Sequence, residues 1–213
     1  MSFIETKYTP TALSDYVCDE NVSSILKPYL GHQSKRPLLL YGEPGTGKTQ
    51  LAKLLPKAVC EDFYEGDTIW IDAGLDRGVG KIREIENRIA LYASNSMNFH
   101  CVCLDEVDQL SPDAMLALKN VLTRYMDMTS PYVLFVMTTN HIARIDAAVK
   151  DRCEAVHIDA PTIDHLVPMG LEILQNEGKK ADETLFRKVL QAKSFNNRLS
   201  YREFYRRVER LAA

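Results

Sequence analysis

The sequence lacks the features that mark membrane, secreted and zinc-binding proteins. No apolar run approaches the roughly 18 residues of a membrane-spanning helix, and the first ten residues, MSFIETKYTP, contain no apolar stretch typical of a signal peptide. The five cysteines form no C-x-x-C pair, and no histidine stands at a zinc-binding spacing from them. We therefore expect a cytoplasmic protein without a membrane segment, in which Cys18, Cys60, Cys101, Cys103 and Cys153 are buried, reduced thiols.

The sequence also lacks a strong charge of either sign. Its 213 residues carry a net charge of −3, which is too small to draw the whole chain to nucleic acid or to a membrane surface. A composition of 46% hydrophobic and 26% charged residues is ordinary for a globular protein. Because there is no repeat or low-complexity segment, this length predicts one large domain, or a core with a small appendage.

Apolar strands alternate with helices along most of the chain. Short apolar runs predict strands over residues 36–42, 68–72, 100–105, 132–138 and 155–158. Helical spacing and capping signals predict helices over residues 19–27, 48–59, 80–94 and 112–126, whereas Pro10 favours an extended segment over residues 1–12. The alternation predicts an α/β three-layer sandwich around a parallel sheet.

The pattern changes near Pro161, where the strands stop. Only helical periodicity follows, over residues 164–177, 182–193 and 199–212. We therefore predict an α/β core over residues 1–160 and a small α-helical domain over residues 161–213.

The segment from Gly42 to Thr49 fits the phosphate-binding pattern G-x-x-x-x-G-K-[ST] at every fixed position, between a predicted strand and a predicted helix. Its glycines allow a tight loop whose N–H groups surround phosphate oxygens, and the helix adds the positive end of its dipole. Lys48 is expected to contact the β- and γ-phosphates of ATP, and the Thr49 hydroxyl to bind Mg²⁺. The predicted nucleotide contacts are Gly42, Glu43, Pro44, Gly45, Thr46, Gly47, Lys48, Thr49 and the adjacent Gln50.

Two acids follow the predicted strand over residues 100–105. Ligands of such sheets bind at the carboxyl ends of the strands, which places Asp105 near Thr49 as a second Mg²⁺ ligand. Glu106 is expected to orient or deprotonate the attacking water. Asp108 has two possible roles. It could hydrogen bond the residues that contact the nucleotide or metal, or it could be an ordinary exposed loop charge, and we favour the exposed charge.

With these motifs the chain resembles the AAA+ ATPases, a family of P-loop NTPases, and within them the small ATPase subunits of sliding-clamp loaders. Lys7-Tyr8-Thr9-Pro10 resembles the opening Lys-Tyr-Arg-Pro of those subunits, with Thr9 in place of Arg. Thr138-Thr139-Asn140 matches the sensor 1 position, and Asp151-Arg152-Cys153 matches the Ser-Arg-Cys motif with Asp in place of Ser. The resemblance covers residues 5–212 and implies a nucleotide-binding core and a helical lid, without the collar domain of clamp-loader subunits.

The resemblance also implies roles for single residues. Asn140 would hydrogen bond the γ-phosphate or the attacking water, although a strand-end Asn can also simply cap a turn. Arg152 would be an arginine finger that acts on a neighbouring subunit's ATP, since a guanidinium suits the spread-out charge of a transferring phosphoryl group. Its plainer reading is a surface arginine in a salt bridge.

In the lid, the segment Ser200-Tyr-Arg202-Glu-Phe resembles sensor 2, which makes Arg202 a contact of the γ-phosphate. The rival arginines for this role are Arg198, Arg206 and Arg207. Tyr8 and Val17 would border the adenine, although Tyr8 reads equally well as a core tyrosine. The spacing of Arg198, Arg202 and Arg206 would place all three on one face, if a single helix holds them, and a basic face of this kind can bind a phosphate backbone.

The resulting prediction is an AAA+ ATPase that uses ATP and Mg²⁺ and works as a homo- or hetero-oligomer with an arginine finger in trans. The first hypothesis is a clamp-loader-like ATPase in DNA replication or repair, with DNA and a DNA-processing protein as candidate partners. The second is an ATP-dependent switch that recruits a helicase, transposase or nuclease. A protein-remodelling chaperone ranks last, because residues 74–80 lack the aromatic residue of a pore loop.

Overall fold

The computed structural model describes residues 3–17, 19–63 and 65–212. These residues divide into two compact units, which are described separately. One comprises residues 19–42 and 48–158, and the other comprises residues 1–18, 43–47 and 159–213 as far as they are described. Among the described residues, no helix is long and apolar enough to cross a membrane.

The first unit is built on a five-stranded sheet in the order β2-β3-β4-β1-β5, in which all neighbouring strands run parallel. Its strands are β1 (Leu38–Tyr41), β2 (Thr68–Asp72), β3 (Phe99–Asp105), β4 (Tyr132–Thr139) and β5 (Glu154–His157). The inner strands β3 and β4 are buried along nearly their whole length, as expected where helices cover both faces of a parallel sheet.

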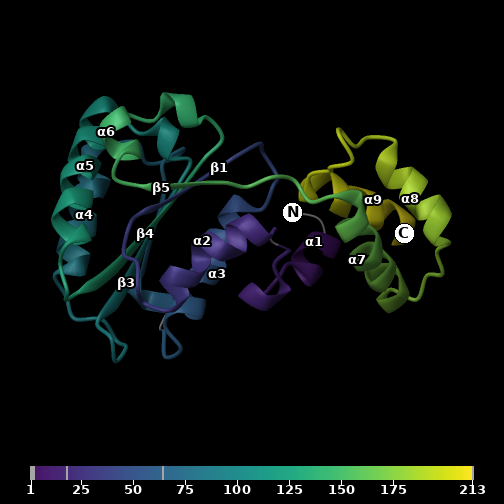
Figure 1. The fold of residues 1–213 in the computed structure, drawn as a ribbon, viewed down its shortest axis with the longest axis horizontal. Coiled ribbons are helices and arrows are strands. Elements are labelled where there is room, and N and C mark those ends of the chain that lie inside the picture. The colour runs from purple at the N-terminus through teal and green to yellow at the C-terminus, as the bar shows by residue number, and fades with distance from the viewer. Residues whose placement is uncertain (1–2, 18, 64, 213) are drawn as a thin grey trace. The chain divides into compact units, whose positions relative to one another are not determined.

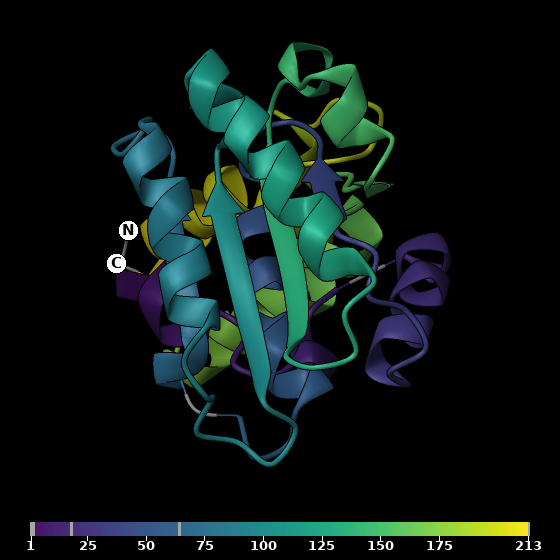
Figure 2. The same cartoon turned by 90° about the vertical axis from the view of Figure 1, so that its left-hand side faces the viewer.

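Helices cover both faces of this sheet, as Figures 1 and 2 show. The helices of this unit are α2 (Glu20–Leu30), α3 (Lys48–Val59), α4 (Val79–Ile89), α5 (Pro112–Met126) and α6 (Ala147–Lys150). Figure 1 shows α4 and α5 on one side of the sheet and α2 and α3 on the other. The predicted three-layer sandwich with a parallel sheet is therefore confirmed. α2 runs past its predicted end at Lys27, because Pro28 lies in the last turn, where it interrupts little of the helical hydrogen bonding.

The second unit is helical and has its own apolar core. It contains α1 (Phe3–Tyr8), α7 (Ile163–Asn176), α8 (Glu183–Gln191) and α9 (Tyr201–Ala212). Gly170 lets α7 approach the ring of Phe186, since a Cβ at this position would lie 2.3 Å from the Phe186 Cζ atom. The expected C-terminal helices are thus present, close to their predicted bounds.

The extended segment predicted over residues 1–12 is wrong for Phe3–Tyr8, which form α1. Ile4 is buried in the apolar core of the second unit, and the Phe3 backbone N–H donates to Glu209 of α9. Packing against distant residues therefore stabilises a short helix that Pro10 ends but does not prevent. The described residues also form 3₁₀ turns at Leu13–Asp15, Glu65–Asp67, Val107–Gln109 and Ile142–Arg144.

The described cysteines are buried thiols, as predicted. Burial raises the pKa of Cys60 and Cys153 to about 12 and that of Cys101 well above its ordinary value, so these thiols stay protonated and unreactive. Cys18 lies outside the described residues.

Candidate active site

The loop between β1 and α3 begins at a glycine that no other residue can replace without strain. Gly42 has a φ of +151°, and a Cβ on it would lie 2.3 Å from the carbonyl oxygen of Ile158. The loop glycines Gly45 and Gly47 also have positive φ, at +79° and +95°. These positive φ values strain any residue other than glycine, which is the physical reason why the motif has glycines at these positions.

Lys48 begins α3 and is held beside the start of the loop. Its side chain donates a hydrogen bond from Nζ to the Gly42 carbonyl oxygen at 2.9 Å, and the residue is only 6% exposed. A buried ammonium is stable only when hydrogen bonded, so the ammonium is kept next to the loop that the motif assigns to phosphates.

Thr49 and Asp105 meet where α3 begins and β3 ends. The Thr49 hydroxyl lies 3.0 Å and 3.3 Å from the two carboxylate oxygens of Asp105. Hydroxyl and carboxylate oxygens are the hard ligands that Mg²⁺ prefers, and Mg²⁺ commonly takes one or two protein ligands beside water and phosphate oxygens. The pair therefore fits Mg²⁺, even though the described residues contain no group of three or more His, Cys, Asp or Glu side chains placed to hold a metal ion by themselves.

Glu106 adopts a conformation that is rare for a residue other than glycine, with φ of 53° and ψ of 45°. Its backbone N–H donates to the Thr138 hydroxyl at 3.1 Å, and that hydroxyl donates in turn to the Asp105 carboxylate. Thr138 is buried, so one side chain of β4 holds the backbone of one acid and the carboxylate of the other. Sequence reasoning assigned Thr138 to the sensor 1 segment but did not predict this contact.

Gly74 is a further residue that the sequence did not indicate. A Cβ on Gly74 would lie 3.0 Å from the Glu106 carboxylate and 3.0 Å from the carboxylate of Asp72. Asp72 ends β2 in register with Asp105 on β3, and it accepts a hydrogen bond from the Gly74 N–H at 2.9 Å. The absence of a side chain at Gly74 therefore leaves room for the Glu106 carboxylate.

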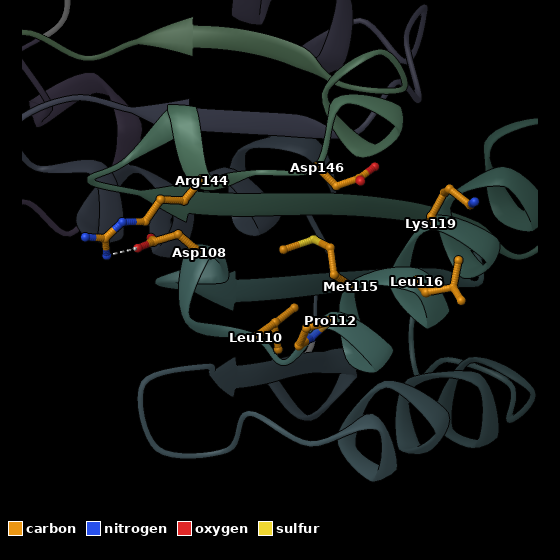
Figure 3. A pocket seen from close by; sticks show the side chains of 8 residues that line it. All are labelled: Asp108, Leu110, Pro112, Met115, Leu116, Lys119, Arg144 and Asp146. Atoms are coloured by element: carbon orange, nitrogen blue, oxygen red, sulfur yellow. Dashed lines mark ion pairs between the residues drawn. The ribbon is translucent and has the colours of Figure 1, made fainter.

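The reading of Asp108 as an exposed loop charge is wrong. Its side chain is only 2% exposed, because the end of β4 lies against it. The carboxylate accepts hydrogen bonds from the Thr139 hydroxyl at 2.6 Å and from the Gln109 amide at 2.9 Å. Arg144 forms an ion pair with it at 3.9 Å, as Figure 3 shows.

Asn140 and Arg152 both lie in the same unit as these acids. Asn140 follows the last residue of β4 and is partly exposed. Arg152 donates from Nε to the Thr123 hydroxyl at 2.7 Å and from Nη1 to the Ala148 carbonyl at 2.6 Å. The guanidinium is thus held against α5 and α6 of its own chain, and its predicted role in trans stays a prediction.

In the second unit, the N-terminus of α9 contacts the loop. The Tyr201 N–H donates to the Gly45 carbonyl at 2.9 Å, and a Cβ on Gly45 would lie 3.4 Å from the Cβ of Arg202. A Cβ on Gly47 would lie 3.0 Å from the Tyr16 hydroxyl. The structure therefore brings Arg202, on α9, beside Gly45.

The rival arginines have other partners. Arg198 bonds the Ala160 carbonyl at 2.7 Å, and Arg206 and Arg207 both pair with Glu203. Arg202 makes no side-chain hydrogen bond or ion pair with any residue that the structure describes. Arg198 also precedes α9, so no single helix holds Arg198, Arg202 and Arg206, and the condition for a shared basic face is not met.

Tyr8 and Val17, which are predicted to border the adenine, both lie in the second unit. The Tyr8 hydroxyl donates to the Glu177 carboxylate at 2.8 Å, and this bond raises the pKa of Tyr8. Tyr8 also packs against the apolar core of this unit, which agrees with its reading as a core tyrosine. Val17 is half-buried, as is Gln50 in the first unit.

Comparisons with known proteins agree with this geometry. A family model described as "ATPase family associated with various cellular activities (AAA)" matches residues 38–159. The chain is 32% identical over 179 residues to replication factor C small subunit 1 of Pyrobaculum islandicum, which covers 83% of this chain and 53% of that relative. It is 29% identical over 182 residues to replication factor C subunit 5 of Mus musculus, covering 83% and 52%. The chain thus spans about half the length of these curated relatives.

Two solved structures have a similar fold. RuvB of Thermotoga maritima, in a variant form, matches with a TM-score of 0.62 and 15% identity over 95% of this chain and 72% of that one. A DNA polymerase III gamma subunit-related protein of the same organism matches with a TM-score of 0.58 and 19% identity, covering 79% and 56%. At these identities the likeness concerns the fold alone, and it supports the P-loop NTPase architecture.

Proposed function

We propose that this chain, which belongs to the AAA family of ATPases, binds ATP with Mg²⁺ at the loop from Gly42 to Thr49 and hydrolyses it. The observation that carries the proposal is the polar cluster at the ends of β3 and β4. There the Thr49 and Thr138 hydroxyls bond the Asp105 carboxylate, and Thr138 also holds the backbone of Glu106. Hydroxyls that converge on adjacent acids beside a phosphate-binding loop are suited to phosphoryl transfer.

Each residue of this cluster has a separate task in the proposal. Lys48 neutralises charge on the β- and γ-phosphates, and Thr49 and Asp105 hold the metal, directly or through water. Mg²⁺ bound there supplies the positive charge that stabilises the transferring phosphoryl group. Glu106 accepts the proton of the attacking water, and Asn140 orients that water or the γ-phosphate.

Arg202 is the arginine that the second unit would offer to the γ-phosphate. Its position beside Gly45 supports this role, and so do the competing contacts of the rival arginines. Tyr8 and Val17 would border the adenine. We keep residues 1–160 as the proposed nucleotide-binding core and residues 161–213 as the proposed lid, although the described part of residues 1–18 and residues 43–47 group with the helical unit.

The relatives support a narrower proposal. Since relatives at about 30% identity are named as replication factor C subunits, we propose a clamp-loader-like ATPase that acts in DNA replication or repair. Arg152 would then leave its contacts with Thr123 and Ala148 and reach the nucleotide of a neighbouring subunit. DNA and a DNA-processing protein are the proposed partners.

Calorimetry and turnover assays test the proposal together. Wild-type protein should bind ATP in a Mg²⁺-dependent manner. Glu106→Gln should keep that binding but lose at least about 100-fold in turnover, the size expected for a general base. Glu172→Gln, at an exposed position of α7, is the matched control. Absence of Mg²⁺-dependent binding in folded wild-type protein would overturn the proposal.

A second measurement separates the clamp-loader role from the switch. Stimulation of turnover by DNA together with a sliding clamp supports the clamp-loader role. Slow turnover that DNA and clamp leave unchanged, with oligomers that form only in ATP, supports instead a switch that recruits a helicase, transposase or nuclease.

A further inference from the structure

We propose that the buried carboxylate of Asp108 is a positioning residue for hydrolysis, which fixes Asn140 relative to Glu106 by holding Thr139. The inference rests on the proposed function and adds to it a residue outside the proposed nucleotide and metal contacts. Its role is to keep two groups from different strands at a constant separation.

The first link is a rigid turn between Glu106 and Asp108. The Gln109 N–H donates to the Glu106 carbonyl at 2.8 Å, and the Leu110 N–H donates to the Val107 carbonyl at 3.2 Å. These bonds close the 3₁₀ turn that carries Asp108. The backbone of Glu106 and the carboxylate of Asp108 therefore move as one piece.

The second link joins Asp108 to both neighbours of Asn140. The Thr139 hydroxyl donates to the Asp108 carboxylate at 2.6 Å and accepts the backbone N–H of His141 at 2.9 Å. Its single hydrogen is thus committed to Asp108, while its oxygen ties the chain after Asn140 back to the chain before it. Because Thr139 is only 1% exposed, water competes little for these bonds.

Thr138 makes a parallel connection on the other face of β4, because successive residues of a strand point to opposite sides. It bonds the Glu106 N–H and the Asp105 carboxylate. The acidic loop is therefore attached to the end of β4 twice, by consecutive threonines. Asn140 can shift relative to Glu106 only if a buried hydrogen bond of one of these threonines breaks.

The burial of a carboxylate here needs an explanation other than stability. Removing a carboxylate from water costs free energy even when the carboxylate is hydrogen bonded. An apolar side chain of similar size at a buried position often gives a protein that is equally stable. Asp108 forms one wall of a pocket of about 330 Å³ whose apolar side chains include Leu110 and Met115, as Figure 3 shows. The same pocket is lined by the charged side chains of Lys119, Arg144 and Asp146, so the carboxylate is not isolated. Its shortest bond is the directional one from the Thr139 hydroxyl at 2.6 Å.

The test is a set of matched variants measured for turnover, ATP affinity and thermal unfolding. Asp108→Ala and Thr139→Val each remove one end of the Asp108–Thr139 bond. We expect each to lower kcat by about tenfold or more while the Kd for ATP–Mg stays within about twofold, because only the orientation of the reacting groups is disturbed. The double variant should lose no more than the worse single variant, since both changes break the same bond.

Conservative variants show whether the hydrogen bond is the cause. Asp108→Asn keeps an acceptor oxygen for Thr139, and Thr139→Ser keeps the hydroxyl, so both should retain kcat within about threefold of the wild type. If Asp108→Ala instead lowers only the melting temperature and leaves kcat per folded site unchanged, the positioning role is overturned.

The Glu106→Gln variant distinguishes failure of this inference from failure of the proposed function. Wild-type turnover that Glu106→Gln abolishes but Asp108→Ala and Thr139→Val leave intact overturns this inference alone. Should the folded wild type hydrolyse no ATP, the proposed function and this inference both fall. If Asp108→Ala proves unfolded, Thr139→Val compared with Thr139→Ser decides the question in the same assay.

Discussion

Thr138 accepts the backbone N–H of Glu106 at 3.1 Å, although the two residues stand 32 positions apart in the chain. Glu106 is in the left-handed region, where a residue other than glycine is strained by about 1–3 kcal/mol. The bond from a buried hydroxyl of the neighbouring strand helps to hold this conformation. It explains how the acid proposed as the general base is kept in one place at the end of β3.

Thr138→Val should therefore weaken both the fold and catalysis. The variant leaves the Glu106 N–H and the Asp105 carboxylate without their shared partner, which should lower the free energy of unfolding by about 1–3 kcal/mol. Urea unfolding measures this loss, and Thr184→Val, at an exposed position of α8, is the control. An unchanged unfolding midpoint in Thr138→Val would contradict the assigned contact.

Gly74→Ala should affect catalysis more than stability. The added Cβ would press on the Glu106 and Asp72 carboxylates, and the ends of side chains can move away at little cost. We expect turnover to fall by about tenfold, since small displacements of a general base are expensive in rate, while the melting temperature stays nearly constant. Gly80→Ala is the control, because nothing lies within 4 Å of a Cβ there. Equal turnover in the two variants would show that Glu106 does not need the space.

Gly170→Ala should destabilise the helical unit. The new methyl group would overlap the Phe186 ring and lie 3.1 Å from the Phe204 ring, both fixed in the apolar core. Overpacking of this kind costs about 1–3 kcal/mol, which denaturant unfolding can measure against the same Gly80→Ala control. A variant as stable as the wild type would mean that α7 and α8 pack more loosely than described.

Arg152 can be tested by complementation between two inactive variants. Arg152→Ala retains its own Glu106 but lacks the finger, and Glu106→Gln lacks the base but retains Arg152. If the finger acts in trans, mixing the two variants should restore turnover at mixed interfaces, because a Glu106→Gln subunit supplies the arginine to its neighbour. Each variant alone should turn over at least about 100-fold more slowly than the wild type. A mixture no more active than the separate variants would contradict the role of Arg152 in trans. Its contacts with Thr123 and Ala148 would then be its only assigned interactions.

The attachment of α1 to α7 should weaken in acid. Lys7 and Tyr8 both bond the Glu177 carboxylate, which lowers the pKa of Glu177 below its ordinary value of 4.5. A carboxyl whose pKa is lower when folded stabilises the protein above its unfolded pKa, and this contribution is lost as the pH falls through the folded pKa. The stability difference between wild type and Glu177→Gln should therefore be present at pH 7 and disappear in acid. Because these side chains are at least partly exposed, solvent screens their interaction and we expect a small effect in urea unfolding. A difference that grows in acid would contradict the assignment.

Much of the fold follows from local signals. The bounds of α5 were predicted correctly because Ser111 caps the helix and Pro112 occupies its first turn, and both act within a few residues. β2 was likewise predicted at its observed bounds. α1 was missed, since six residues form a helix only when distant residues bury one of its faces.

The sequence by itself determined the phosphate-binding loop and its setting between a strand and a helix. Its signals are glycines and a lysine at fixed spacings within eight consecutive residues, so they can be identified without knowing what the rest of the chain does. Only the tertiary structure decided that Asp108 is buried, that Thr138 holds Glu106, and that Gly74 borders Glu106. These contacts join residues about 30 positions apart on neighbouring strands, and the strand order that aligns them results from packing the whole sheet.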